Sequence, residues 1–444
     1  MRGESVKQIG GEGTVPSVRI SEAAFPAPFA SGLEYSVPAR GGWTIVHVGM
    51  LLPEAHEIFV CAAGCLRGVV LSAAEMGLSD RFSTVAIEEH NVTDGDMEEL
   101  IITGVTDILN RLPKRPRAVL VYSSCLHHFL GCDLALCYDT LRERFPEVDF
   151  ADCYMIPTMR KSGLTPDQIM RRQLYSLLRP ADRLPRHCAV VGNCFSMDQS
   201  SDLVSLIRSA GWTLHQITEC RTYEEYQQMA QCELCISTQP VARAGAEALA
   251  ERLGMRHLYL PAGFDANGIK ANLARLAEAL GCDRRDSARA EEKAERALQK
   301  VREVIGAAPI YIDHTVSPRP LGLARLLVGH GFCVSGIFAD AFSPEEREDF
   351  LWLREQMPDL ELLPTVHPAM RRYPLKSGEK VLALGQKAAY FRNTPYFVDL
   401  VEGGGLYGFD GICRLCDRMT EAFSEPKDTQ KRISQKGSGW KSCI

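Results

Sequence analysis

The fold is indicated most clearly by residues 118–125, Ala-Val-Leu-Val-Tyr-Ser-Ser-Cys, where an apolar run ends in two serines and a cysteine. A short apolar run of this kind, Ala118–Tyr122, is typical of a strand buried on both faces of a sheet. A helical pattern follows at Asp133–Arg144. A buried strand followed by an amphipathic helix predicts a parallel sheet with crossover helices.

The same alternation recurs along the chain. Further strands are expected at Ala189–Val191, Leu214–Ile217, Ile310–Ile312 and Cys333–Phe338, with helices at Asp198–Ala210, Ala288–Val304 and Leu321–His330. The pattern predicts an α/β fold with three Rossmann-like domains, at residues 31–183, 184–305 and 306–423, the last ending in a helix. Residues 1–30 and 424–444 are polar and without periodicity, so both segments are expected to be mobile or to become ordered on a partner.

Composition excludes several classes of protein. The 444 residues are 45% hydrophobic and carry a formal net charge of −6, so no basic footprint for nucleic acid is present. No apolar run approaches the ~20 residues that span a bilayer, and no secretory signal is recognisable. The chain is therefore expected to be cytoplasmic. It contains neither a Walker A motif nor G-x-G-x-x-G, so nucleotide hydrolysis would occur on another polypeptide.

The 16 cysteines of the chain suggest metal or redox chemistry, because a cytoplasmic protein rarely uses disulfides. Most are nevertheless expected to be small buried hydrophobes, among them Cys188, Cys333 and Cys282. Cys413 and Cys416 lie on a predicted amphipathic helix and are expected to pack inward.

Two cysteine-bearing loops stand out from the others. In residues 60–70, Val-Cys-Ala-Ala-Gly-Cys-Leu-Arg-Gly-Val-Val, Cys65 opens a predicted helix, where unpaired N–H groups favour thiolate. Cys125 follows a predicted strand at the carboxyl edge of the sheet, where open sheets place ligands. Thiols from two such loops can converge on one iron–sulfur cluster, although two buried structural thiols fit the spacing as well.

A series of motifs resembles the nitrogenase component 1 family. The matching segments are Gly32–Tyr35, Arg40–Trp43, His47–Met50, Cys61–Met76, Phe82–Thr84, Val92–Asp96, Tyr122–Cys125, Leu130–Asp133, Ser317–Pro320, Gly385–Tyr390 and Leu406–Gly411. They occur in the family's order and spacing from about residue 30 to residue 420.

The resemblance implies three Rossmann-like domains of the nitrogenase component 1 type and a cluster at a subunit interface, either 4Fe-4S or P-cluster-like 8Fe-7S. Cys125 matches one family ligand, and Cys65 or Cys61 matches another. The family's earlier cysteine has no counterpart, so three ligands per subunit require both Cys61 and Cys65. The implied partners are a second component 1 subunit, in a homodimer or heterodimer, and a separate ATP-binding iron protein.

A second metallocofactor is less clearly implied. The family histidine that precedes the closing motif is missing, because Pro395–Leu406 contains none. Cys235 lies near the position of the family's cofactor cysteine, and His367 is considered as a substitute ligand or as a helix cap. Arg319 belongs to the loop that opens the third domain. These three residues form a possible second cofactor region.

Three further residues flank the candidate cluster ligands. His127 and His128 follow Cys125, and one of them is a candidate for a hydrogen bond to a cluster sulfur; an exposed loop pair is the alternative. Arg67 is placed to offset cluster charge or to form a surface ion pair.

The sequence thus predicts an oxidoreductase, the catalytic component of an ATP-dependent, nitrogenase-like reductase of unidentified substrate. Electrons would pass from the iron protein through the interface cluster to a substrate or metallocofactor. The alternatives are a non-catalytic scaffold for assembly of such a cofactor, a tetrapyrrole reductase, and an α/β binding protein without a cluster.

Overall fold

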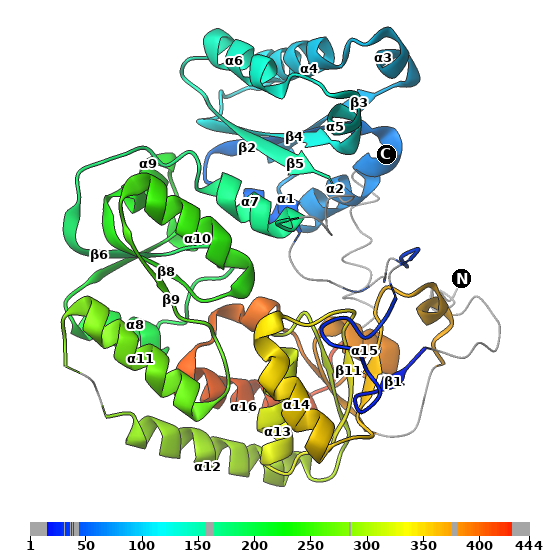
Figure 1. The fold of residues 1–444 in the computed structure, drawn as a ribbon, viewed down its shortest axis with the longest axis vertical. Helices are drawn as coiled ribbons and strands as arrows, with labels where there is room; N and C mark the ends of the chain where they lie inside the picture. Colours follow the sequence, from blue (N-terminus) through cyan, green and yellow to red (C-terminus); the bar gives the residue numbers. More distant parts are fainter. Residues whose placement is uncertain are drawn as a thin grey trace. The chain divides into compact units, whose positions relative to one another are not determined.

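The computed structural model describes residues 16–30, 32–35, 37, 39, 44–156, 163–283, 286–374 and 380–428 (Figure 1). Residues 1–15 and 429–444 of the expected mobile ends, and the motif residues 40–43, lie outside these ranges. The chain divides into two compact units. The N-terminal unit consists mainly of residues 43–196 and 211–260, and the C-terminal unit of residues 1–42, 197–210 and 261–436.

The first sheet of the N-terminal unit is parallel throughout, in the order β3-β2-β4-β5. Its strands are β2 (Ala55–Ala62), β3 (Phe82–Ile87), β4 (Ala118–Ser124) and β5 (Asp149–Met155). All of β4 is buried, because alternate side chains enter two different cores. Val119 and Val121 pack with α4 and α6, whereas Leu120 and Tyr122 pack with α1 and α7.

The helices of this layer follow the strands in regular alternation. They are α1 (Ile45–Gly49), α2 (Ala63–Glu75), α3 (Glu89–Asp94), α4 (Met97–Arg111), α5 (Cys125–Leu130), α6 (Leu134–Arg144) and α7 (Pro166–Leu174). Asp133 caps α6 by accepting a hydrogen bond from the backbone N–H of Leu136 at 3.0 Å. This cap satisfies one of the N–H groups left free at a helix start.

The second sheet of the N-terminal unit is also parallel, in the order β7-β6-β8-β9. It contains β6 (Leu184–Val190), β7 (Thr213–Gln216), β8 (Cys232–Ser237) and β9 (Arg256–Tyr259), with α9 (Tyr223–Gln228) and α10 (Pro240–Leu253). The strands expected near residues 189 and 214 are thus present, each beginning earlier than predicted.

The C-terminal unit contains a six-stranded sheet in the order β1-β12-β11-β10-β13-β14. The strands are β1 (Val18–Arg19), β10 (Ile310–Asp313), β11 (Val334–Phe338), β12 (Glu361–Leu363), β13 (Leu382–Leu384) and β14 (Phe397–Val398). The helices are α8 (Asp202–Ser209), α11 (Ala266–Leu280), α12 (Ala288–Ile305), α13 (Pro320–Gly329), α14 (Arg347–Gln356), α15 (Gln386–Arg392) and α16 (Gly408–Ser424).

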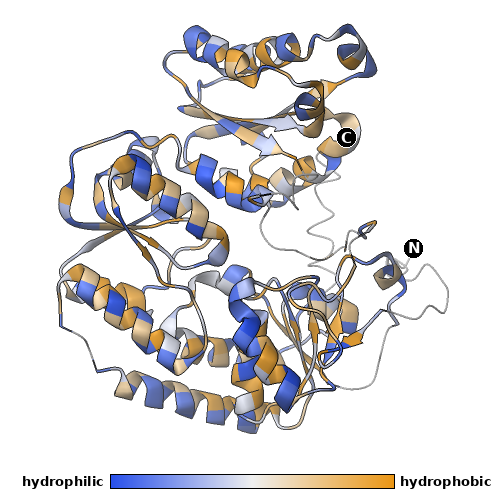
Figure 2. Ribbon diagram, viewed as in Figure 1, coloured by the Kyte–Doolittle hydropathy of each residue, from blue (hydrophilic) through white to orange (hydrophobic). Residues whose placement is uncertain are grey.

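Helix α12 is the amphipathic helix expected at Ala288–Val304. Its buried residues Ala294, Leu298, Val301 and Ile305 recur at helical spacing and join the core that also contains α16. Figure 2 shows hydrophilic and hydrophobic residues alternating along this helix. Among the described residues, no helix is both long and apolar enough to cross a membrane.

Strand β1 was not anticipated, because residues 1–30 were expected to be mobile. Val18 and Arg19 pair antiparallel with β12, and Ile20 next to them is fully buried in the core. Only two residues form this edge strand, so no alternating pattern announces it. Its stability comes from the sheet edge and from the buried isoleucine.

The expected burial of the cysteines is partly corrected. Cys188, Cys413 and Cys416 are buried as predicted, and Cys282 is half-buried. The prediction for Cys333 was wrong, because this residue lies exposed in the turn just before β11.

Gly385 provides a test of the C-terminal sheet. Its φ is +108°, and a Cβ at this position would overlap the buried carboxylate of Asp313. We expect Gly385→Ala to lower the apparent free energy of unfolding by about 3 kcal/mol, measured by urea denaturation. In Gly281→Ala the φ is +70° but the surrounding space is open, so a loss of only about 1 kcal/mol is expected. Equal losses in the two variants would contradict the role of Asp313.

Candidate functional site

Three cysteines lie at the carboxyl edge of the first sheet. Cys61 is the next-to-last residue of β2 and is fully buried, Cys65 lies exposed in the first turn of α2, and Cys125 is the half-buried first residue of α5. Strands β2 and β4 are parallel neighbours with Val60 opposite Ser123. Both strands therefore end at the same edge of the sheet.

The thiols also share one electrostatic environment. Burial, followed by the negative charges of the Cys65 and Cys125 thiolates, raises the pKa of the Cys61 thiol to about 12. At neutral pH, Cys61 is therefore protonated unless a cation lies beside it. Iron supplies such positive charge and binds the thiolate form.

This donor set fits an iron–sulfur cluster better than a single ion. Within the described ranges, no group of three or more His, Cys, Asp or Glu side chains is close enough to hold one metal ion. A cluster of several irons binds thiolates spaced more widely, because each sulfur binds a different iron. The structure places all three predicted ligands at one edge of the same sheet, and their role as ligands stays a prediction.

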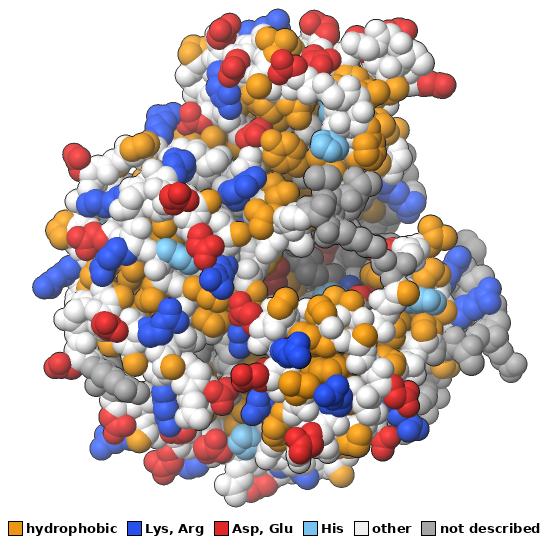
Figure 3. All heavy atoms as spheres, in the orientation of Figure 1, with side chains coloured by type: hydrophobic (Ala, Val, Ile, Leu, Met, Phe, Trp, Pro, Cys, Tyr) orange, Lys and Arg blue, Asp and Glu red, His pale blue; other side chains and the backbone are white. Residues whose placement is uncertain are grey.

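An exposed apolar surface lies beside these thiols. Helix α2 is rich in apolar residues, of which Ala73 is buried and Leu66, Val69, Val70 and Leu71 are half-buried. In and after α5, Phe129, Leu130 and Leu136 are 66%, 48% and 56% exposed. Figure 3 shows hydrophobic side chains gathered over α5. We refer to the half-buried apolar residues of α2 together with Phe129, Leu130 and Leu136 as the α2–α5 surface.

The two histidines after Cys125 differ in environment. His127 is fully buried, and its Nδ1 accepts a hydrogen bond from the backbone N–H of Ser124 at 3.0 Å. Its Nε2 has no hydrogen-bond partner among the described residues. Burial lowers the pKa of His127, so the ring is neutral and carries its proton on Nε2. His128 is exposed beside Phe129, and Arg67 is exposed on α2.

Each of the possible second cofactor residues has contacts of its own within its unit. Cys235 is fully buried in β8, and its Sγ donates to the carbonyl of Ala246 on α10 at 3.8 Å, which favours a role in packing. His367 caps the turn that follows it, since its Nδ1 accepts from the backbone N–H of Ala369 at 3.1 Å. Arg319 forms an ion pair with Glu345 at 2.6 Å.

A buried polar cluster, not singled out from the sequence, lies at the carboxyl edge of the C-terminal sheet. The Nζ atom of Lys387 lies 3.5 Å from Nε2 of His314 and donates to Oγ1 of Thr365 at 3.3 Å. Asp313, at the end of β10, accepts from the backbone N–H of Ala388 at 2.8 Å. Asp340 accepts from the backbone N–H of Thr365 at 2.9 Å. We call Asp313, His314, Asp340, Thr365 and Lys387 the lysine cluster.

Burial determines the charge of this cluster. Burial lowers the pKa of Lys387, while Asp313 and Asp340 oppose the change. Burial, followed by the positive charge of Lys387, lowers the pKa of His314 to about 3. His314 is therefore neutral at physiological pH. The only sequence signal was the glycine-initiated motif that contains Lys387, because the other residues come from strand ends far apart in the chain.

The neutral state of His314 makes stability depend on pH. The unfolded histidine has a pKa near 6.5, so its stabilising contribution is complete above that pH and is lost as the pH falls toward 3. When the pH is lowered from 6.5 to 5, we expect the free energy of unfolding of the wild type to fall by about 2 kcal/mol more than that of His314→Asn. Urea denaturation measures both values. The exposed His90 provides the control His90→Asn, which retains the wild-type slope. Parallel slopes for the wild type and His314→Asn would contradict the assignment.

A family model described as "Nitrogenase component 1 type Oxidoreductase" matches residues 46–424. This match covers most of the sequence, and the chain therefore belongs to the nitrogenase component 1 type oxidoreductases. The predicted family and α/β fold are thus confirmed.

Solved structures agree with this assignment at the level of fold. The chain is similar to "Nitrogenase Cp1 at pH 6.5", with a TM-score of 0.64 and 13% identity over 89% of this chain and 95% of that one. For "Nitrogenase Cp1 at pH 5" the TM-score is 0.57, with 14% identity over 92% and 93% of the two chains. A search of curated protein sequences finds no match.

Proposed function

We propose that this chain is the cluster-bearing catalytic subunit of a nitrogenase-like reductase. The observation that carries the proposal is the meeting of Cys61, Cys65 and Cys125 at one sheet edge, where the charges of two thiols act on the third. Membership of an oxidoreductase family supports a redox role for these thiols. The substrate receives low-potential electrons that originate on a separate protein.

The three thiols have distinct tasks in this proposal. Cys125 and Cys65 lie in the first turns of α5 and α2 and present their sulfurs at the protein surface, whereas Cys61 binds from the interior. An iron–sulfur cluster held there supplies one-electron transfer at low potential. The Nε2–H of His127 and the exposed His128 and Arg67 are the groups of this chain proposed to modulate the potential.

A second component 1 subunit is the proposed partner at the α2–α5 surface. Exposed apolar residues beside a candidate cluster are expected where two subunits share the cluster, since association removes that surface from water. The ATP-binding iron protein is the proposed electron donor, because this chain carries no Walker A motif of its own.

The lysine cluster is the proposed site at which a substrate or a second cofactor is held and receives the electrons. Open α/β sheets bind ligands outside the carboxyl ends of their strands, where Asp313 and His314 lie. A buried lysine beside a neutral histidine offers positive charge and a proton to a ligand that accepts electrons. The lysine cluster therefore replaces Cys235, His367 and Arg319 as our preferred second site.

Cluster binding is tested by anaerobic purification with iron and sulfide quantification and electron paramagnetic resonance. We expect Cys125→Ala to lose most of its iron and the cluster signal while retaining its circular dichroism spectrum. Cys333→Ala removes an exposed thiol from the other unit and should retain full iron content. Iron content unchanged in Cys125→Ala would refute the ligand assignment.

The single variants Cys61→Ala and Cys65→Ala determine which of these two residues binds. If both variants lose iron, Cys61 and Cys65 both bind, and this chain supplies three ligands together with Cys125. Loss in one alone leaves two ligands per subunit, which is sufficient when two subunits each contribute a pair.

A scaffold for cofactor assembly is the second candidate, favoured by the absence of histidine from Pro395–Leu406. The two functions differ in turnover. A reductase oxidises the reduced iron protein in step with ATP hydrolysis and substrate reduction, whereas a scaffold transfers its metal to an apo-enzyme. A tetrapyrrole reductase would contain iron and sulfide without molybdenum or vanadium.

The subunit interface gives a separate prediction. Placing charges on the α2–α5 surface in Phe129→Glu/Leu136→Glu should shift the sedimentation profile of the purified protein from dimer to monomer, because unpaired charges are costly at an apolar interface. The matched control Leu351→Glu alters an exposed leucine of α14 and should leave the dimer intact. A dimer that persists in the double variant would place the interface elsewhere.

A further inference from the structure

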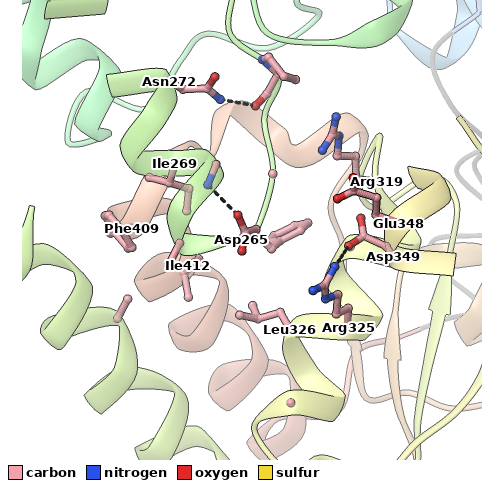
Figure 4. A pocket seen from close by; sticks show the side chains of 18 of the residues that line it. Asp265, Ile269, Asn272, Arg319, Arg325, Leu326, Glu348, Asp349, Phe409 and Ile412 are labelled. Carbon is pink, nitrogen blue, oxygen red and sulfur yellow. Dashed lines mark hydrogen bonds and ion pairs between the residues drawn. The ribbon is translucent and has the colours of Figure 1, made fainter. Parts of the chain in front are cut away.

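A pocket of the C-terminal unit belongs to none of the sites described above. It has a volume of about 560 Å³, and its walls come from α11, α12, α13, α14 and α16 (Figure 4). This volume lies within the range of sites that bind small molecules. Neither the three thiols nor the residues of the lysine cluster line it.

The floor of the pocket is apolar and partly open to water. The apolar side chains that line it include Phe264, Ile269, Ala294, Leu298, Leu326, Trp352, Phe409 and Ile412. Most of them belong to the core of the unit, so the packing of the helices holds the floor in place. Phe264, Leu326 and Trp352 are only half-buried. An apolar body bound here would therefore remove apolar surface from water, which favours binding.

The rim of the pocket carries an excess of negative charge. Five carboxylates line it, from Asp265, Glu295, Glu345, Glu348 and Asp349, against two guanidinium groups. Arg319 pairs with Glu345 at 2.6 Å, and Arg325 pairs with Asp349 at 3.0 Å. Each guanidinium charge is thereby balanced by one carboxylate, and three carboxylates remain.

The three remaining carboxylates differ in their contacts. Glu295 contacts Nε2 of His330 at 3.0 Å. Asp265 accepts a hydrogen bond from the backbone N–H of Gly268 at 2.6 Å through Oδ2, and the described residues donate none to its Oδ1. Asp265 and Glu348 take part in none of the ion pairs formed between the described residues of this pocket. These two carboxylates are therefore available to a ligand.

A metal ion does not account for the two available carboxylates. Within the part of the chain that the structure describes, no group of three or more His, Cys, Asp or Glu side chains is close enough to hold one. Figure 4 shows Asp265, Leu326 and Ile412 around the same space. Apolar side chains beside a carboxylate suit an organic cation, because such a cation brings an apolar body together with its charge.

We propose that this pocket binds a small organic cation, a primary amine whose ammonium group lies at Asp265 and Glu348 and whose apolar body covers Phe264 and Leu326. An ammonium group carries three N–H donors and a charge opposite to that of the rim, so both carboxylates attract it. The same carboxylates repel an anion of the same shape, and a neutral molecule gains only the apolar contact. The ligand class thus follows from the sign of the charge and the apolar floor together.

Three compounds with one apolar body and different charge test the ligand class. Phenethylamine, phenethyl alcohol and phenylacetate are titrated into the full-length protein at pH 7 and low ionic strength, and saturation-transfer NMR gives the affinities. We expect the amine to bind about tenfold more tightly than the alcohol, and phenylacetate more weakly than both. Raising the salt to about 0.5 M should bring the affinity of the amine close to that of the alcohol, because salt screens the rim.

Every other order of affinities contradicts the proposal. Equal affinities of amine and alcohol at low salt would show that the rim charge plays no part. Tighter binding of phenylacetate would reverse the ligand class, and binding of none of the three compounds would overturn the site.

A charge-neutralising variant locates the amine at the two carboxylates. Asp265→Asn/Glu348→Gln removes both charges and retains an oxygen that caps the start of α11. Its affinity for the amine should fall about tenfold, to that of the alcohol, whereas its affinity for the alcohol should stay the same. The matched control Glu303→Gln/Glu355→Gln removes two exposed carboxylates that do not line the pocket, and should change either affinity less than twofold. Equal losses in the two double variants would reduce the effect to net charge and overturn the proposal.

A further variant fills the pocket without changing its charge. Gly329 lines the pocket and has open space where a side chain would start. Gly329→Leu should therefore weaken binding of the amine and of the alcohol at least fivefold, while the melting temperature is retained. Undiminished binding of the amine by the folded Gly329→Leu protein would place the compound elsewhere and refute the proposal.

Discussion

The parallel pairing of β2 with β4 is the constraint on which the candidate cluster site depends. It brings Cys61 and Cys125, separated by more than sixty residues in the chain, to the same edge of one sheet. The register is maintained by burial on both faces, since a slip of one residue would turn Val60 and Ser123 to the wrong layers. Gly49 contributes at this edge, because a Cβ there would overlap Glu57 and Tyr122 of the two strands.

Buried polar groups in the two units are stabilised by different means. In the C-terminal unit, Asp313 and Asp340 accept backbone N–H groups, and Lys387 lies near both carboxylates. These contacts offset much of the cost of removing charge from water. At the thiol site, no cation of the described residues lowers the pKa of Cys61, and burial keeps this thiol protonated. The polar contacts of the lysine cluster come from this chain, whereas the proposed function requires an added iron–sulfur cluster to complete the thiol site.

Local sequence patterns predicted the elements that carry continuous apolar runs. β4, β10 and β11 are such strands, and their helices show the expected periodicity. The same reasoning could not find β1, whose two residues pair with a partner more than 300 positions away. It also misplaced Cys333, because one residue at the start of a strand can lie on either side of its boundary.

The candidate site residues also differ in whether a sequence pattern could reveal them. Cys61, Cys65 and Cys125 could be proposed as ligands because each lies where a recognisable strand gives way to a helix. The lysine cluster was missed because each of its members is a single polar residue after a different strand. Likewise, an apolar helix that faces its own core has the same sequence pattern as one that faces a partner. The partial exposure of α2 could therefore be recognised only from the three-dimensional structure.

In the proposed assembly, cluster binding and subunit association are one equilibrium. A four-iron cluster needs four protein ligands, and this chain offers three thiols at most at the edge. Ligands from a second subunit then bind only when the α2–α5 surfaces meet, and burial of Phe129 and Leu136 holds them there. Whatever stabilises the cluster therefore stabilises the dimer by the same free energy, and loss of iron exposes the apolar surface again.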